Sequence, residues 1–111
     1  MTKDDRYYPL PKNLRLGFSK IHDIGLFAKK KIKQGEELGI THVQIGKHLI
    51  RTPLGGFINH SNDPNCTKSM FRVSNVDDAF IKMDYKVWRL FTLNNIKKDE
   101  ELTLTYTFYK I

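Results

Sequence analysis

Apolar and polar residues alternate in short runs along this chain. From Leu14 to Phe18 the alternation has the two-residue period of a half-buried strand. Further runs rich in β-branched and aromatic residues predict strands at 24–28, 37–43, 48–51, 70–73, 79–83, 87–93 and 102–109. No window before residue 60 sustains the i, i+3, i+4, i+7 spacing of a helix. The pattern therefore predicts a mostly β fold of short strands with few or no α-helices.

Turn-forming residues separate these runs and include one internal echo. The polar stretch 74–78 predicts a turn between two strands. The segment 31–38, KIKQGEEL, returns at 95–102 as NIKKDEEL. Gly35 and Asp99 occupy the same place in the two copies, and both residue types tolerate positive φ. We therefore expect two similar strand–turn–strand corners rather than a tandem repeat.

The length of 111 residues fits one domain. Residues 1–13 are polar with Pro9 and Pro11, which predicts an extended N-terminal lead-in. Residues 14–111 are expected to form the single domain.

The chain is basic, with 19 lysines and arginines against 12 acidic residues and a net charge of +7. Two interpretations stay open: attraction to nucleic acid or to a complex that contains it, and simple solubility. The lysines of 29–33 and 97–98 are spread along the sequence instead of gathered in one basic helix. This spread slightly favours solubility.

Cys66 is the single cysteine, which excludes an internal disulfide and a multi-cysteine zinc cluster. We predict no metal site. No apolar run approaches the roughly 20 residues of a transmembrane helix, and no secretory apolar segment follows the charged start. The expectation is a soluble intracellular protein without a membrane partner, cytoplasmic or, if viral, in the nucleus of its host.

Three segments carry candidate chemistry. The first, 21–28, has Gly25 before an apolar run, with Asp23 two residues earlier. The second, 56–66, is dense in side-chain donors and acceptors around Asn59 and His60, which suits a loop that caps an adenine. The third, 100–106, is a predicted strand that ends in Tyr106.

In this order the three segments resemble the SET-domain protein lysine methyltransferase family, in its minimal free-standing viral or microbial type. Asp23 replaces the first glycine of a Gly-x-Gly pattern, Asn62 replaces a usual cysteine, and Leu104-Thr105 replace an inner Tyr-Asp. The resemblance covers about 14–108. It implies the SET β-clip fold, with short strands in several small sheets and the C-terminal segment threaded against the Asn-His-Ser loop.

The resemblance also implies a function, the transfer of a methyl group from S-adenosylmethionine to a lysine side chain of a protein. Tyr106 would be the catalytic residue. The implied cofactor-binding residues are Ile24, Gly25, Leu26, Asn59 and His60, and the candidate substrate-channel residues are Phe108, Leu104 and Tyr85. The number of methyl groups transferred stays open.

The partners are expectations too. The substrate would be a histone or ribosomal protein, since a net charge of +7 suits a lysine presented on a nucleic-acid complex. The short insert at about 39–54 shapes the substrate groove in relatives, so we expect a second subunit to complete the site in a homo-oligomer, most simply a dimer.

Three alternatives remain. One is a non-catalytic binding module on the same β-clip architecture, as in SAF-like domains, which share a corner like 28–36. Another is a SET fold that binds cofactor but has lost turnover, given Asp23 and Leu104. The last is a small basic nucleic-acid-binding β-barrel, for which 82–89 offers interleaved basic and aromatic residues.

Overall fold

A computed structural model of the chain describes residues 10–75 and 83–107. The elements follow in the order β1 (Leu14–Phe18), β2 (Ile24–Ala28), β3 (Glu37–Ile45), β4 (His48–Arg51), α1 (Pro53–Phe57), β5 (Asn59–His60), β6 (Cys66–Asn75), β7 (Met83–Thr92) and β8 (Glu101–Leu104). The predicted mostly β fold is confirmed.

Several strands have the predicted bounds and others differ. β1, β2 and β4 have the predicted bounds, and β3 and β6 extend beyond the predicted 37–43 and 70–73. β7 begins at Met83 and ends at Thr92, where 87–93 was predicted. β8 ends at Leu104 instead of continuing to residue 109, and Ser74 still belongs to β6 instead of the predicted turn. Most of the predicted strand 79–83 lies outside the described residues.

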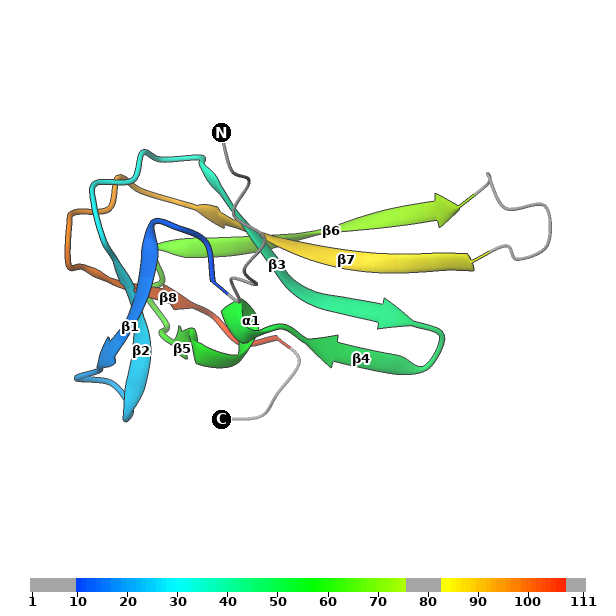
Figure 1. Ribbon diagram of the computed structural model, residues 1–111, viewed down its shortest axis with the longest axis horizontal. Helices are drawn as coiled ribbons and strands as arrows, with labels where there is room; N and C mark the ends of the chain where they lie inside the picture. Colours follow the sequence, from blue (N-terminus) through cyan, green and yellow to red (C-terminus); the bar gives the residue numbers. More distant parts are fainter. Residues whose placement is uncertain (1–9, 76–82, 108–111) are drawn as a thin grey trace, which may run out of the picture.

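The strands form two small sheets, as Figure 1 shows. One has the order β1-β2-β8-β5, in which β5 and β8 run parallel. The other has the order β4-β3-β7-β6, all antiparallel, and its two long hairpins project away from the first sheet.

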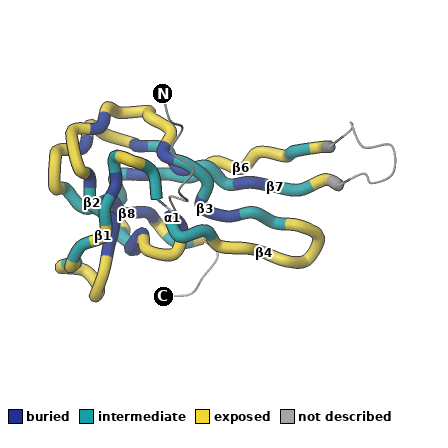
Figure 2. Tube along the Cα trace, viewed as in Figure 1, coloured by how far each residue is buried: buried dark blue, intermediate teal, exposed yellow. Residues whose placement is uncertain are grey.

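The hydrophobic core takes residues from both sheets and from α1. Exposure increases toward the tips of the hairpins (Figure 2). Burying these aliphatic side chains is the main favourable contribution to folding. The core residues are Leu14, Leu26, Ala28, Ile32, Leu38, Leu54, Ile58, Cys66, Leu90, Ile96, Leu102 and Leu104.

The two echoed segments lie against each other. Ile32 and Ile96 form an isolated antiparallel bridge in which each N–H donates to the other's carbonyl, at 2.9 and 2.8 Å. Gly35 and Asp99 both have positive φ, 81° and 68°. The predicted pair of corners is therefore confirmed, and the structure adds that the corners are partners.

The short helix α1 directs the chain into the Asn-His-Ser segment. Thr52 caps it by accepting a hydrogen bond from the N–H of Gly55 at 3.3 Å, and Pro53 begins it. The Thr52 hydroxyl also donates to the carbonyl of Ile40 at 2.6 Å. Gly55 lies so close to the backbone of Thr41 that a Cβ there would overlap it. These contacts fix where β5 begins.

Candidate active site

The C-terminal segment and the Asn-His-Ser segment run alongside each other. Asn59 pairs with Thr103 and His60 with Leu104 in the parallel β5–β8 ladder. The N–H of Ser61 donates to the carbonyl of Leu104 at 3.1 Å, and the Thr105 hydroxyl donates to the carbonyl of Ser61 at 2.8 Å. The expected threading of the C-terminal segment against this loop is confirmed.

Beyond β8, Tyr106 is held by both its backbone and its side chain. Its N–H donates to Nδ1 of His60 at 2.9 Å, and its hydroxyl donates to the carbonyl of Ile58 at 2.7 Å. The two rings pack edge to face, with centroids 5.2 Å apart. Because the phenolic proton is donated to Ile58, the Tyr106 oxygen can meet another group only as an acceptor.

These contacts fix the tautomer of His60. Nδ1 accepts from Tyr106, so the proton of the neutral ring is on Nε2, 3.0 Å from Oδ1 of Asn62. The His60 ring therefore connects Asn62 on one side to the backbone of Tyr106 on the other.

Asn59 is buried, with 6% of its surface exposed. Its amide nitrogen lies close to acceptors in β8, in β2 and in the turn between β1 and β2. Nδ2 is 2.9 Å from Oε2 of Glu101, 3.1 Å from the carbonyl of His22 and 3.3 Å from that of Ile24. Its two protons thus join β8 to the turn between β1 and β2.

Ser19 and Glu101 complete this polar cluster, and the sequence analysis assigned a role to neither. The Ser19 hydroxyl is 2.8 Å from each carboxylate oxygen of Glu101 and accepts from the N–H groups of Ile21 and His22 at 2.9 and 3.3 Å. Ser19 therefore stabilises the turn between β1 and β2, and Glu101 connects this turn to β8. The signal in the sequence was the acidic pair Glu100-Glu101, whose second member begins β8.

Gly25 lies against the carboxylate of Glu101. A Cβ at this position would overlap Oε2 of Glu101 and come within 3.0 Å of Nδ2 of Asn59. An alanine at this position would therefore displace the Glu101 carboxylate from its contacts with Asn59 and Ser19. In the preceding turn Asp23 has a φ of 34°, and its side chain is 85% exposed, with Oδ2 3.4 Å from Nε2 of His22.

The other predicted cofactor-binding residues flank Gly25. Ile24 is 43% exposed, and with Leu16, Gly17 and Phe18 it lines a shallow apolar hollow of about 240 Å³. Leu26 is fully buried in the core and is paired with Leu16 on one side and Leu102 on the other.

The structure separates Leu104 from Tyr85, two of the three predicted channel residues. Leu104 is 4% exposed in the hydrophobic core, beside His60 in the ladder. Phe108 lies outside the described residues. Tyr85 belongs to the other sheet, opposite Ile45 and Val73, and the structure does not bring it to Tyr106. The strand pattern placed Tyr85 between the predicted strands 79–83 and 87–93, and it could not say which sheet this residue would join.

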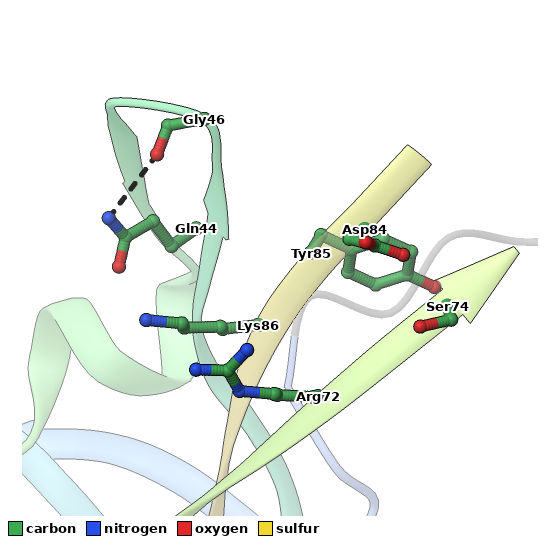
Figure 3. Close-up of a pocket in the computed structure, with 7 residues that line it drawn as sticks. All are labelled: Gln44, Gly46, Arg72, Ser74, Asp84, Tyr85 and Lys86. Atoms are coloured by element: carbon green, nitrogen blue, oxygen red, sulfur yellow. Dashed lines mark hydrogen bonds between the residues drawn. The ribbon is translucent and has the colours of Figure 1, made fainter. Parts of the chain in front are cut away.

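Tyr85 instead borders a different hollow, of about 220 Å³ (Figure 3). Arg72 and Lys86, opposite each other in the β6–β7 ladder, project side by side there. Gln44 of β3 and Asp84 of β7 contribute as well. This hollow is a feature of the projecting hairpins, not of the Tyr106 site.

Comparisons with known proteins find a matching family model and a solved structure of similar fold. The SET domain family model matches residues 43–107, more than half of the chain. This chain belongs to the SET domain family. The match spans the Asn-His-Ser segment, β8 and Tyr106, and the family membership argues against the small nucleic-acid-binding barrel.

A solved structure has the same fold. It is a Plasmodium falciparum protein described as a "putative histone methyltransferase", with a TM-score of 0.65 and 19% identity, over 90% of this chain and 97% of that one. The comparison with curated proteins finds no match. Among the described residues, this SET-domain chain has no helix that is both long and apolar enough to cross a membrane.

Proposed function

We propose that this SET-domain protein is an S-adenosylmethionine-dependent protein-lysine N-methyltransferase and that Tyr106 is its catalytic residue. The observation that carries the proposal is the double anchoring of Tyr106, through His60 at 2.9 Å and Ile58 at 2.7 Å. Two fixed points orient the phenol before any substrate arrives, and such preorganisation is what alignment-controlled chemistry requires.

The chemistry of the local groups fits the cofactor. S-adenosylmethionine has a cationic sulfonium, an ammonium and a carboxylate, and when bound it supplies an electrophilic methyl group. The exposed carboxylate of Asp23 can meet the ammonium of the cofactor.

The residues proposed to hold the cofactor are Ile24, Gly25, Leu26, Asn59 and His60. Because the amide nitrogen of Asn59 serves β8 and the β1–β2 turn, Asn59 would act chiefly by positioning the turn that carries Ile24 and Gly25. Leu26 is fully buried and would act by supporting the strand that carries Ile24 and Gly25.

The role of Tyr106 follows from its hydrogen bonds. A lysine ammonium, with a reference pKa of about 10.4, must lose a proton to solvent before its nitrogen can attack. A phenol whose proton is already donated to a carbonyl is no base for that step. Its oxygen can accept an N–H of the neutral amine and so aim the nitrogen lone pair at the methyl group. Proximity and alignment then provide most of the acceleration.

The partners of the enzyme are part of the proposal. The substrate would be a lysine of a histone or ribosomal protein that is bound to nucleic acid. The net charge of +7 would favour association of the enzyme with such a complex, because nucleic acid is negatively charged. A homodimer would complete a substrate groove that the short insert leaves small. A gel-filtration mass of one chain would contradict the dimer.

Methyl transfer from labelled cofactor to nucleosomes, ribosomes and free histones tests the activity. We expect Tyr106→Phe to lower the transfer rate on the order of a hundredfold, because the acceptor oxygen is lost while the backbone bond to His60 remains. Tyr85→Phe removes a hydroxyl from the other sheet and should leave the rate unchanged.

Binding of S-adenosylmethionine by calorimetry separates the alternatives. The wild type and Tyr106→Phe should bind it about equally. Unchanged transfer in Tyr106→Phe would exclude the catalytic assignment. Absence of cofactor binding in the wild type would indicate a non-catalytic β-clip module instead.

A further inference from the structure

The bridge between Ile32 and Ile96 gathers lysines that are far apart in the sequence. In Figure 1 the turn after β2 and the turn before β8 lie side by side at the end of the molecule opposite the projecting hairpins. Six exposed lysines occupy these two turns: Lys29, Lys30, Lys31, Lys33, Lys97 and Lys98. We call this set the lysine corner. The lysines that seemed scattered in sequence therefore form one basic surface.

The register of the bridge places like charges opposite each other. In antiparallel pairing, the neighbours of Ile32 and Ile96 that face one another are Lys31 and Lys97. Like charges in directly opposed positions are destabilising on a sheet. A partner that supplies negative charge would remove this penalty.

Few acidic residues are near these lysines in the sequence, and two of the three already have other partners. Asp99 pairs with Arg15 at 3.2 Å, and a carboxylate oxygen of Glu100 accepts from the backbone N–H of Lys97 at 3.0 Å. Glu36 is exposed at the end of the first turn. None of the ion pairs seen within residues 10–75 and 83–107 involves a lysine of the corner.

The corner also encloses an open hollow of about 760 Å³. Its lining consists of Lys31, Ile32, Lys33, Gln34, Asn95, Ile96 and Lys97. This lining contains lysines and amides but no aromatic ring on which a base could stack and no arginine that could read a base edge. Lysine ammonium groups act on phosphates as point charges without demanding a fixed orientation.

We propose that the lysine corner binds the phosphate backbone of double-stranded nucleic acid, independently of its sequence. Charge complementarity selects an anionic partner, and the absence of aromatic and arginine side chains from the lining selects a duplex over a single strand. The site is distinct from the Tyr106 site and needs neither cofactor nor methyl transfer to act.

Fluorescence anisotropy with a labelled duplex of about 20 base pairs, without cofactor, tests the proposal. The variant K31E/K97E reverses both facing lysines but keeps a like-charged pair, so its folding stability should change little. The matched control R72E/K86E carries the same net charge and reverses two facing cations of the β6–β7 ladder instead. We expect K31E/K97E to bind about tenfold more weakly or worse and R72E/K86E to stay within about threefold of the wild type.

The neutral variant K31Q/K97Q provides an independent measurement. Loss of two phosphate contacts should reduce the slope of log Kd against log salt by about two. If circular dichroism shows that K31E/K97E does not fold, the duplex affinities of K31Q/K97Q and R72Q/K86Q are compared instead.

Four outcomes would overturn the proposal. Equal weakening in both charge-reversal variants would indicate net charge alone, and weakening confined to R72E/K86E would place the site on the hairpins. Tighter binding of a single strand than of the duplex would indicate a stacking surface elsewhere. Displacement of the duplex by polyglutamate at equal charge concentration would indicate an acidic protein as the partner.

Discussion

The backbone N–H of Tyr106 donates to Nδ1 of His60 across 2.9 Å, so the predicted catalytic residue is held by a predicted cofactor-binding one. This bond joins the residues after β8 to β5. The Tyr106 hydroxyl donates to the carbonyl of Ile58, which directly precedes β5, at 2.7 Å. His60 is therefore a positioning residue for Tyr106 as well as a candidate contact of the cofactor. The two roles can be separated experimentally.

His60→Leu should lower the maximal rate of methyl transfer about ten- to a hundredfold, because Tyr106 loses the anchor that aligns it. His60→Asn should retain much more of the rate, because its side-chain oxygen can accept the N–H of Tyr106. Steady-state kinetics with separate kcat and KM values measures both. Equal losses in the two variants, with a raised KM for cofactor, would show that the imidazole acts on the cofactor and not through Tyr106.

Gly25→Ala should lower the free energy of unfolding by about 1–3 kcal/mol, because the new Cβ overlaps the Glu101 carboxylate. Urea denaturation followed by circular dichroism measures the change. Gly56→Ala is the matched control, since a Cβ there meets only Arg51 side-chain atoms at 3.7 Å or more and alanine favours a helix.

The same contact predicts coupling between two residues. In a Glu101→Ala background the cost of Gly25→Ala should shrink, because the overlapping carboxylate is gone. A double-mutant cycle that gives additive costs would contradict the explanation that Gly25 is required by Glu101.

Local pattern was enough to predict much of the fold. The two-residue period of 14–18 predicts β1 correctly as a strand, but not its burial, because of the three apolar positions only Leu14 is buried and Phe18 is 93% exposed. Positive φ at Gly35 and Asp99 was predictable from the echoed turn, because turn conformation depends on nearby residues.

Contacts between distant segments were not predictable in this way. Nothing local to Gly25 indicates that Glu101 lies against it, and nothing local to Lys31 indicates that Lys97 faces it. Both relationships depend on which strands become neighbours, as does the placement of Tyr85 in the other sheet. Sequence identified the residue types at the site, and topology decided their partners.

Cys66 should be chemically inert while the protein is folded. It is 1% exposed, and burial, with the nearby charge of Glu100, raises the pKa of its thiol to about 12. At pH 8 we expect native Cys66 to react with a thiol reagent on the order of a thousandfold more slowly than the chain unfolded in urea, because the thiolate is the reactive form. Rapid labelling of the native protein at the unfolded rate would contradict this.

The stability of the protein should fall as the pH decreases from 6.5 to 4, and His42 should be a main cause. His42 is 2% exposed, and burial, with the charges of Lys68 and Arg51, lowers its pKa from 6.5 to about 4. Between these pH values His42 is protonated in the unfolded chain but not in the folded protein. The contribution of neutral His42 to the free energy of unfolding is therefore complete above pH 6.5 and lost by pH 4. It amounts to about 2–3 kcal/mol.

Urea denaturation at several pH values, with His42→Asn beside the wild type, isolates this contribution from that of the carboxylates. An asparagine can keep the contact that Nδ1 makes with the Thr41 hydroxyl at 2.9 Å, and it does not titrate. The slope of unfolding free energy against pH between 4 and 6.5 should therefore be shallower in His42→Asn. His22→Asn makes the same exchange at a residue whose side chain is 76% exposed, and it controls for the exchange itself. Equal slopes in the wild type and His42→Asn would show that the folded protein accommodates protonated His42, and the acid sensitivity would then belong to other groups.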